Sequence, residues 1–300
     1  MEIFRLPFGA MASQCEIVLA APDLACARTQ AAAAMAEVAR IEHKYSRYRP
    51  DSIVARINQA AGRTAVQCDD ETLALLQFAD ELYQHSAGLF DLTSGVLRQA
   101  WDFRQPRLPD PARLAECLQR IGWPRVQRDG ASIYLPQAGM QLDFGGFGKE
   151  YAADRAADVL RQHGVQHGYV NLAGDFRILG PRPNGTPWQI GIQDPRQRDR
   201  LVASIPVLQG ALTTSGDYER YFELDGQRYC HILDPRDGQP VRYWRSVTIL
   251  APLAIVAGGV STIAMLKQQQ GLAYLEASGY SYLAIDHQGQ PHQAVRHQTP

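Results

Sequence analysis

The residues best suited to chemistry lie in one segment, Leu142–Asp154, which reads LDFGGFGKEYAAD. Its glycines, Gly145, Gly146 and Gly148, let the backbone come close to a ligand and adopt positive φ angles. Lys149 then places a cation where a predicted helix presents its free N–H groups. This arrangement suits an anionic group such as a phosphate. A tight strand-to-helix turn with a solvated lysine explains the same residues equally well.

Two well-known phosphate-binding patterns are excluded in this segment. A Walker loop would need glycine in place of Asp143 and Ser or Thr in place of Glu150. The triplet Asp143-Phe144-Gly145 imitates a kinase element, but the chain has no HRD catalytic loop. A phosphate site here would therefore belong to another class of protein.

Two further segments place a polar residue beside a turn. Residues 45–58, YSRYRPDSIVARIN, offer Tyr48 beside a predicted pocket, unless Tyr48 is a packed surface tyrosine. Residues 171–175, NLAGD, leave a strand through a glycine turn and expose Asp175, as an ordinary turn aspartate would be exposed. Both side chains are candidates for contacting a ligand.

Two more such segments follow later in the chain. Residues 213–217, TTSGD, are small hydroxyl donors beside a glycine and suit phosphate or ribose oxygens, although a capped turn would have the same composition. Residues 230–238, CHILDPRDG, put His231 at a strand end before two consecutive turns. A lone histidine is usually structural, so only its neighbours make His231 a candidate.

Composition narrows the class of protein. The 300 residues carry a net charge of −1 and are 45% hydrophobic, which is enough for a substantial core and too balanced to attract nucleic acid or an anionic membrane. No nucleic-acid-binding motif occurs in the sequence. The 5 cysteines are scattered and form no CxxC pair, so they indicate neither a disulfide framework nor a zinc site and favour a reducing compartment.

Two segments bear on membrane targeting. Glu2, Arg5 and Glu16 interrupt the N-terminal segment where a signal peptide needs an apolar core, so we expect a cytoplasmic protein, or a periplasmic one if the chain is a processed form. Residues 246–266 carry no charge, but a proline and the Gly258-Gly259 pair interrupt them. A buried strand, a turn and a short helix fit this segment better than a membrane span. We therefore expect no membrane insertion.

The periodicity of the chain predicts the elements that must hold these candidates. Helices are expected over five segments: Leu24–Tyr45, Glu71–Ser86, Ala112–Ile121, 151–164 and Ser261–Leu275. Strands or hairpins are expected at four places: Asp129-Gly130, Gly168–Leu172, Asp225-Gly226 and Ser281–Ile285. The tail after Gln288 is polar and is expected to fray. Because helices and strands do not alternate regularly, the predicted fold class is α+β.

Seven segments, taken in order, resemble the ApbE family of FAD:protein FMN transferases. They are SRYRPDSIVARIN, FDLTSGVLRQAW, LDFGGFGKEYAADRAA, YVNLAGD, TTSGDYERYF, HILDPRDGQPV and STIAML. The resemblance runs from about Phe8 to about Ile285, nearly the whole chain. It implies a single α+β domain over residues 1–300, with a structured core at about 3–287 and a polar tail at 288–300. The domain would have two lobes with a flavin cleft between them.

The resemblance also implies an activity. Enzymes of this family move the FMN part of FAD onto a threonine of a partner flavoprotein and release AMP, and they need a divalent cation, usually Mg²⁺, at the diphosphate. Two alternatives stay open. One is a pyrophosphatase that splits FAD into FMN and AMP with water, and the other is an FAD-binding protein that has lost transferase activity.

Roles carry over from the family to this chain position by position. Tyr48 resembles the aromatic residue that stacks on the isoalloxazine ring. His231 resembles the group that takes the proton of the incoming threonine, and Asp234 is a second catalytic candidate. Gly148, through its carbonyl, and Thr262 resemble the metal ligands. The remaining matches are assigned to cofactor binding: Asp91, Gly146, Lys149, Asp175, Thr214, Ser215, Gly216 and Asp217.

The metal site departs from the family pattern. The family sequence A-D-A-L-S-T reads AGGVST at residues 257–262, so Gly258 replaces the metal-binding aspartate, and the glycine that follows the lysine is Glu150 here. Another acid such as Glu150 or Asp175 could substitute, the metal could arrive bound to FAD, or transfer could be lost. Because Gly258 and Thr262 would share one face of a helix, the sequence predicts that Gly258→Asp raises Mg²⁺ affinity.

Overall fold

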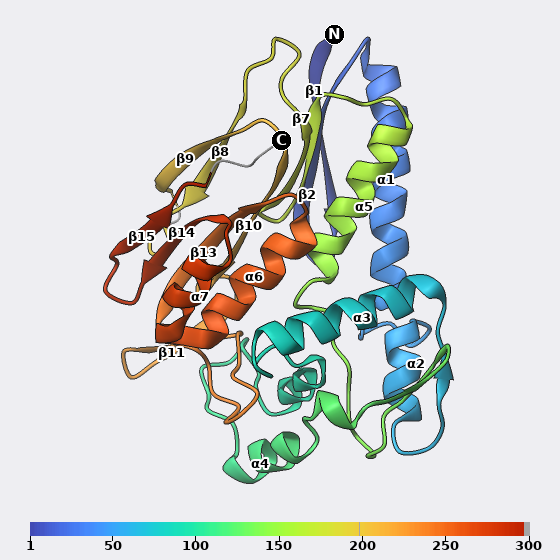
Figure 1. The fold of residues 1–300 in the computed structure, drawn as a ribbon, viewed down its shortest axis with the longest axis vertical. Coiled ribbons are helices and arrows are strands. Elements are labelled where there is room, and N and C mark those ends of the chain that lie inside the picture. The colour runs from blue at the N-terminus through green and yellow to red at the C-terminus, as the bar shows by residue number, and fades with distance from the viewer. Residues whose placement is uncertain (198, 297–300) are drawn as a thin grey trace.

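The protein, as a computed structural model, is described over residues 1–197 and 199–296 and is built around an eight-stranded sheet (Figure 1). Neighbouring strands in this sheet are antiparallel. In spatial order the strands are β1 (Glu2–Ala10), β2 (Ser13–Ala21), β6 (Gly168–Leu172), β7 (Asp175–Gly180), β10 (Gly210–Gly216), β13 (Trp244–Ala251), β14 (Ser281–Asp286) and β15 (Pro291–Ala294). A sheet of this kind with separate helices confirms the predicted α+β class.

The two faces of the sheet are covered by different elements. On one face lie α1 (Leu24–Tyr45), α5 (Gly148–Gln162) and α6 (Ala254–Lys267), and on the other lies the hairpin of β8 (Trp188–Gln193) and β9 (Leu201–Val207) (Figure 1). The apolar residues of the three helices belong to one large buried cluster, and those of the hairpin belong to a second. The sheet is therefore the middle layer of three.

A second lobe lies beyond one end of the sheet (Figure 1). It contains α2 (Ile53–Ala60), α3 (Asp70–His85), α4 (Pro111–Gln119), the 3₁₀ segments η1 (Leu92–Gln99) and η2 (Trp123–Arg125), and the small sheet of β3 (Val66–Gln67), β5 (Ser132–Tyr134) and β4 (Gln127–Asp129). The hairpin of β11 (Tyr221–Leu224) and β12 (Gln227–Cys230) packs on η1 and α4 through a third apolar cluster. After α6, the segments η3 (Gln268–Gln270) and α7 (Gly271–Ala277) lead into β14.

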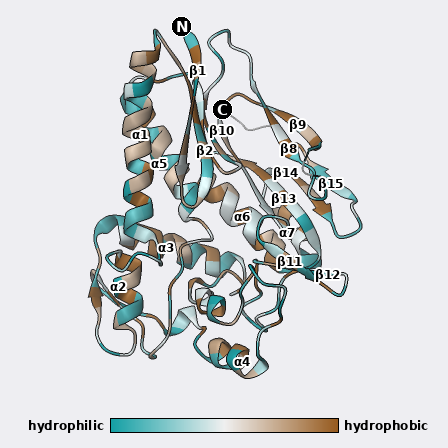
Figure 2. Ribbon diagram, turned by 180° about the vertical axis from the view of Figure 1, so that it is seen from behind, coloured by the Kyte–Doolittle hydropathy of each residue, from teal (hydrophilic) through white to brown (hydrophobic). Residues whose placement is uncertain are grey.

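The ends of the long helices follow local chemistry. α1 begins after Asp23, whose side chain accepts a hydrogen bond from Cys26 N at 2.8 Å. α3 begins after Asp69, whose side chain accepts one from Thr72 N at 3.0 Å. Figure 2 shows bands of hydrophobic and hydrophilic residues along α1, as expected of a helix with one buried face. The predicted bounds are confirmed for α1 and differ by one residue for α3.

Of two hairpin turns in the structure, the sequence predicts one and not the other. Asp225-Gly226 joins β11 to β12 with φ angles of 49° and 74°, as the sequence predicts. Met11-Ala12 joins β1 to β2 with φ angles of 52° and 55°. Residues with a Cβ atom rarely adopt that conformation, so the sequence does not predict this hairpin.

Two helices, α5 and α6, begin well before their predicted first residues. α5 begins three residues before its predicted start, so Lys149 and Glu150 lie in its first turn. α6 begins seven residues early and ends before α7, so Gly258-Gly259 lies inside a helix instead of breaking the segment. A Cβ atom on Gly259 would lie 2.7 Å from Leu82 Cδ2. These glycines allow close packing of the helix against its neighbours.

The uncharged residues 246–266 form part of β13, a turn and most of α6. This confirms the predicted strand, turn and helix. Along the described ranges of the chain, no helix is long and apolar enough to cross a bilayer. α6 is apolar because almost all of its side chains are buried between the sheet and the neighbouring helices.

The polar tail contains β15, so the prediction that it frays is wrong for residues 291–294. β15 pairs with β14, and His292 Nε2 lies 3.0 Å from Asp286 Oδ2. Ser281 Oγ donates to the carbonyl of Arg296 at 3.1 Å and accepts from its N–H at 2.8 Å. Residues 297–300 of the tail lie outside the described residues. The organisation of residues 1–300 as one domain stays a prediction.

A buried carboxylate joins α5, α6 and the sheet. Asp154 on α5 accepts hydrogen bonds from the backbone N–H groups of Ala254 and Ile255, each at 2.9 Å, at the N-terminus of α6. Its Oδ1 atom also lies 2.8 Å from Nε of Arg177 on β7, and these two side chains are 9% and 8% exposed. Asp154 thus caps a neighbouring helix and neutralises a buried cation.

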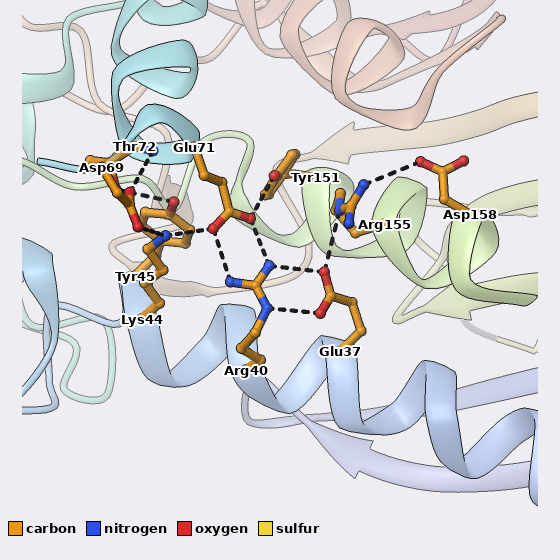
Figure 3. A network of polar contacts seen from close by, with 10 residues as sticks. All are labelled: Glu37, Arg40, Lys44, Tyr45, Asp69, Glu71, Thr72, Tyr151, Arg155 and Asp158. Atoms are coloured by element: carbon orange, nitrogen blue, oxygen red, sulfur yellow. Dashed lines mark hydrogen bonds and ion pairs between the residues drawn. The ribbon is translucent and has the colours of Figure 1, made fainter. Parts of the chain in front are cut away.

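A more exposed ionic network joins α1, α3 and α5 (Figure 3). Glu71 on α3 lies 2.6 Å from Arg40 and 2.5 Å from Lys44, both on α1. It also accepts a hydrogen bond of 2.7 Å from the hydroxyl of Tyr151 on α5. Hydrogen bonds from Arg40, and then from Lys44 and Tyr151, hold the pKa of Glu71 well below its usual range. The network ties the second lobe to the helical face of the sheet.

The buried position of Asp154 predicts a large effect on stability. We expect Asp154→Ala to lower the free energy of unfolding by about 3 kcal/mol or more, because it leaves Arg177 buried without its partner and the α6 N-terminus without its cap. Asp158→Ala is the matched control, since Asp158 is 46% exposed and pairs with surface arginines. The control should change stability by less than about 1 kcal/mol. Urea unfolding of the two variants tests this expectation, and equal losses would contradict it.

Candidate functional site

Several predicted residues meet where the N-terminal turn of α5 faces β7 and β10. Lys149 Nζ lies 2.7 Å from Asp175 Oδ2, and Asp175 Oδ1 accepts a hydrogen bond from Thr214 N at 3.3 Å. Asp175 is only 2% exposed, so the prediction that a turn exposes it is wrong. The turn of Ala173-Gly174 ends before it, and Asp175 is the first residue of β7, with its side chain on the helix-covered face.

Lys149 keeps its charge in this position. Burial alone would lower the pKa of Lys149, but the carboxylates of Asp175 and Glu150 outweigh burial and raise it. The ammonium group is therefore a fixed cation in the first turn of α5. It stands beside backbone N–H groups that also favour an anion.

A row of hydroxyl groups connects β10 to α6. Ser215 Oγ lies 2.8 Å from Ser261 Oγ and 3.2 Å from Thr262 Oγ1. On the neighbouring position, Thr214 Oγ1 lies 2.8 Å from Thr248 Oγ1 of β13. The predicted hydroxyl residues are thus part of a strand, and the alternative of a capped turn is wrong. Ser215 and Thr262, predicted separately for cofactor and metal, are in direct contact.

Glu150 is a buried acid in the same region. It is 9% exposed, and among the described residues its Oε2 atom has no hydrogen-bond partner. Burial, and then the neighbouring charge of Asp175, raise the pKa of Glu150 well above its usual range. Two acidic side chains, Asp175 and Glu150, therefore lie beside the one ammonium group of Lys149, which pairs with Asp175. Such a group gains from an additional cation.

Tyr48 is held at the surface, and the guanidinium of Arg47 lies 5.6 Å from the centre of its ring. The residue is 78% exposed, which makes the alternative of a packed surface tyrosine wrong. Its neighbour Arg47 fixes the backbone, because its Nη1 atom donates to Gly95 O at 2.7 Å and lies 2.9 Å from Asp143 Oδ2. Arg47 thus connects the Tyr48 loop, η1 and the glycine-rich segment. Sequence reasoning missed Arg47, although it precedes Tyr48 in the SRYRPD segment.

His231 follows β12 and is a neutral imidazole. Among the described residues, its Nδ1 atom is buried without a hydrogen-bond partner. Burial, and then the positive charges of Arg98 and Arg220, lower the pKa of His231 to about 3. The imidazole is neutral and has the capacity to accept a proton, but so low a pKa makes it a weak base unless the surrounding positive charge is offset.

Arg98 is a functional candidate that sequence reasoning missed. It lies on η1, and the described residues give it no ion pair, although it lies 5.6 Å from the ring centre of Phe103. Burial lowers the pKa of Arg98, yet a guanidinium keeps its charge in a protein. Arg98, Arg220 and Lys149 together place positive charge around His231. The only sequence signal was its place in FDLTSGVLRQAW.

The carboxylate of Asp91 is already engaged in the fold. It accepts hydrogen bonds from Thr93 N at 2.7 Å and from Thr93 Oγ1 at 2.5 Å, which caps η1. It also accepts one from Trp123 N at 3.0 Å. This gives Asp91 a structural role, and its predicted contact with the cofactor stays a prediction.

Asp217 and Asp234 are also engaged by arginines. Asp217 accepts two hydrogen bonds of 2.7 Å from the guanidinium of Arg196. Asp234 lies 2.6 Å from Nη2 of Arg236, in the turn that follows His231. Both pairs hold loops in place, and the predicted roles of Asp217 in nucleotide binding and Asp234 in catalysis stay predictions.

The predicted glycines have packing reasons of their own. A Cβ atom on Gly146 would lie 2.7 Å from Phe90 Cζ, and one on Gly216 would lie 2.4 Å from Tyr218 Cε1. A side chain at either position would therefore force the neighbouring aromatic ring to move. Gly148 is the first residue of α5, and its N–H donates to Phe144 O at 2.7 Å. Its carbonyl as a metal ligand stays a prediction.

A metal would depend on few protein ligands here. Within residues 1–197 and 199–296, no group of three or more His, Cys, Asp or Glu side chains is placed to hold an ion. Mg²⁺ often binds through one or two carboxylates and the oxygens of a substrate phosphate. Glu150, Asp175 and the Thr262 hydroxyl fit such a sparse site, because Glu150 carries a buried oxygen without a partner. A hollow of about 450 Å³ between α1, α2 and α3 contains none of the predicted residues.

Comparison with known proteins places this site in a family context. The chain matches the ApbE family over residues 11–284. A Vibrio cholerae protein named FAD:protein FMN transferase is 31% identical over 82% of this chain and 75% of its own length. A Klebsiella pneumoniae protein of the same name is 36% identical over 71% and 68%.

Solved structures show the same architecture. The crystal structure of the ApbE protein from Thermotoga maritima has a TM-score of 0.89 and 31% identity, and the likeness covers 98% of this chain and 97% of that one. The flavin transferase ApbE from Vibrio cholerae has a TM-score of 0.87 and 26% identity, with coverage of 99% and 97%. The predicted family resemblance and the α+β fold that it implies are confirmed.

The low pKa of His231 predicts a pH dependence of stability. Between about pH 6.5 and pH 3 the unfolded chain binds a proton at His231 that the folded protein does not, so the free energy of unfolding should fall as the pH falls through this window. We expect the fall to be smaller in His231→Gln than in the unmodified protein. The exposed His163 supplies the control His163→Gln, which should leave the slope unchanged. Urea unfolding at several pH values measures the slopes, and identical slopes for all three proteins would refute the neutral buried imidazole.

Proposed function

The chain belongs to the ApbE family, and from this membership we infer that it is an FAD:protein FMN transferase. FAD is then the flavin donor, and a flavin-acceptor protein is the second substrate. The observation that carries this inference is the match over residues 11–284, together with relatives that bear this name and are matched over most of their length. We propose further that the acceptor group is a threonine hydroxyl of a partner flavoprotein.

The proposed reaction is a phosphoryl transfer with a simple balance of bonds. The threonine oxygen forms a bond to the phosphorus atom of the FMN half, and the anhydride bond between the two phosphates breaks. AMP leaves with the bonding electron pair, and the hydroxyl proton passes to the protein. Positioning and neutralisation of charge supply most of the catalysis in reactions of this class.

His231 is the proposed acceptor of that proton. Its neutral state supports this role, because the imidazole can take a proton without first losing one. Burial lowers the pKa of His231 most, and the added effect of Arg98 and Arg220 would be offset by a bound diphosphate. The basicity of His231 would therefore rise when the substrate is in place.

The diphosphate is proposed to lie near Lys149 and Arg98. Lys149 is a fixed cation at the start of α5, and Arg98 has no carboxylate partner among the described residues. The ring of Tyr48 is proposed to stack on the isoalloxazine, since the residue is exposed and Arg47, which lies over the ring at 5.6 Å, also holds its loop. Together these residues would orient both ends of the FMN half.

Mg²⁺ is part of the proposal. When bound, it would neutralise charge on the diphosphate. The Thr262 hydroxyl and the Gly148 carbonyl are the proposed protein ligands, in a region where the buried Glu150 has an oxygen without a hydrogen-bond partner among the described residues. The ion is needed for charge balance, whereas the protein residues position the substrate.

The transfer activity itself can be tested directly. We expect covalent flavin, visible as in-gel fluorescence, when the protein is incubated with FAD, Mg²⁺ and an acceptor domain from a threonine-linked flavoprotein, with one AMP released per flavin. His231→Gln should slow transfer by about a hundredfold or more, as loss of a general base does. AMP release without acceptor would instead identify a pyrophosphatase. FAD binding with no AMP release under any condition would identify a binding protein.

The stacking role of Tyr48 makes a separate prediction. We expect Tyr48→Ala to weaken FAD binding by about tenfold, because stacking of an aromatic ring on a flat base contributes about 1–3 kcal/mol. Tyr48→Phe keeps the ring and should bind FAD as the unmodified protein does. Because Tyr48 is 78% exposed, both variants should unfold at the same denaturant concentration as the unmodified protein. FAD fluorescence quenching measures the affinity, and equal affinities for Ala and Phe would exclude stacking.

A further inference from the structure

Gly258 and Glu150 share one space between two helices. Gly258 lies on the second turn of α6, and Glu150 lies on the first turn of α5. A Cβ atom built on Gly258 would lie 2.6 Å from Glu150 Cγ, 2.9 Å from Cδ and 2.8 Å from Oε1. Real Cβ atoms essentially never approach other atoms within 3.0 Å. The side chain of Glu150 therefore fills the volume that any side chain at position 258 would enter.

The acid that fills this volume is costly to ionise, because it is buried beside the carboxyl group of Asp175. Glu150 is 9% exposed, and its Oε2 atom has no hydrogen-bond partner among the described residues. A methyl-bearing side chain would fill the same volume without the cost of burying a carboxyl group. The one nearby ammonium group, Lys149, is already 2.7 Å from Asp175. Glu150 thus has one oxygen, Oε2, without a hydrogen-bond partner among the described residues, while its Oε1 atom faces Gly258 on α6.

The surroundings of Glu150 on α6 are rich in oxygen atoms. Ser261 Oγ donates to the carbonyl of Gly258 at 3.0 Å, and Ser215 Oγ connects Ser261 to Thr262. Hydroxyl, carbonyl and carboxylate oxygens are the ligands that hard divalent cations prefer. The oxygen atoms come from two helices and one strand, which the Asp154 contacts hold in register.

We propose that Glu150 supplies from α5 the carboxylate for a divalent cation that an aspartate at position 258 would supply from α6. In this proposal the site still has an acidic ligand, but the ligand comes from α5 instead of α6. This inference rests on the proposed function only for the role of the cation, which would neutralise the diphosphate of FAD during FMN transfer. The cation can be detected without any transfer.

The geometry corrects one expectation from the sequence. Gly258→Asp alone would place its Cβ atom against Glu150 and bring a second carboxyl group into the same space. We therefore expect Gly258→Asp to weaken cation binding or stability, instead of raising Mg²⁺ affinity as the sequence predicts. The double variant Glu150→Gly/Gly258→Asp removes the obstruction and returns the acid to α6.

The test is the affinity for Mn²⁺, followed by electron paramagnetic resonance of the free ion. It is measured for the protein alone and for the protein saturated with FAD, with FAD alone as the reference. We expect the unmodified protein to bind one Mn²⁺ in at least one of the two forms. Glu150→Gln, which keeps the volume and removes the charge, should weaken binding by at least about tenfold. Glu116→Gln, on the exposed face of α4, is the control and should bind as the unmodified protein does.

The double variant gives the decisive comparison. Glu150→Gly should lose Mn²⁺ affinity, and Glu150→Gly/Gly258→Asp should recover most of it. Unchanged affinity in Glu150→Gln overturns the proposal, as does the absence of Mn²⁺ binding in both forms of the unmodified protein. If the double variant does not fold, Glu150→Gln decides alone. If the protein transfers flavin and Glu150→Gln leaves its Mn²⁺ affinity unchanged, the proposed function stands and the inference about Glu150 is wrong. If Mn²⁺ binding depends on Glu150 but no flavin is transferred, the inference stands and the proposed function is wrong.

Discussion

The contact that most of the structure depends on is the one between Asp154, the N-terminus of α6 and Arg177. It is buried, it uses both oxygens of one carboxylate, and it joins two helices and a central strand. Because Glu150 lies one helical turn before Asp154, both side chains project from the same face of α5 toward α6. The register that Asp154 sets is therefore the register in which Glu150 meets Gly258.

The opposite side of α5 carries a different kind of contact. Tyr151 reaches Glu71 of α3, and Arg155 lies 3.2 Å from Glu37 of α1, so this face belongs to the half-exposed ionic network of Figure 3. Single surface pairs contribute little, but a network that spans three helices fixes their relative positions. α5 is thus held from both sides, and its first turn, which carries Lys149, is kept in a defined place beside β7 and β10.

The sequence predicts features that depend on nearby residues. The Asp69 cap, the Asp225-Gly226 turn and the bounds of α1 all follow from residues within one turn of each other. Prediction from the sequence fails where a residue distant in the chain determines the local structure. Gly258-Gly259 looks like a break but lies in a helix, because Glu150 and Leu82 pack against it. Arg98 and Arg47 carry no local signal, since their importance comes from η1, the Tyr48 loop and the glycine-rich segment meeting in space.

The shared volume of Glu150 and Gly258 also constrains how such a sequence can arise. Consider an ancestor with aspartate at position 258 on α6 and glycine at position 150 on α5. Replacing the glycine first would put two carboxyl groups into the space between the helices, whereas losing the aspartate first would leave that space without an acid. If Glu150 supplies the acid as proposed, the two exchanges depend on each other and should occur together. A survey of relatives that scores only the α6 position would then count this chain as lacking the acid, although Glu150 occupies the same space from α5.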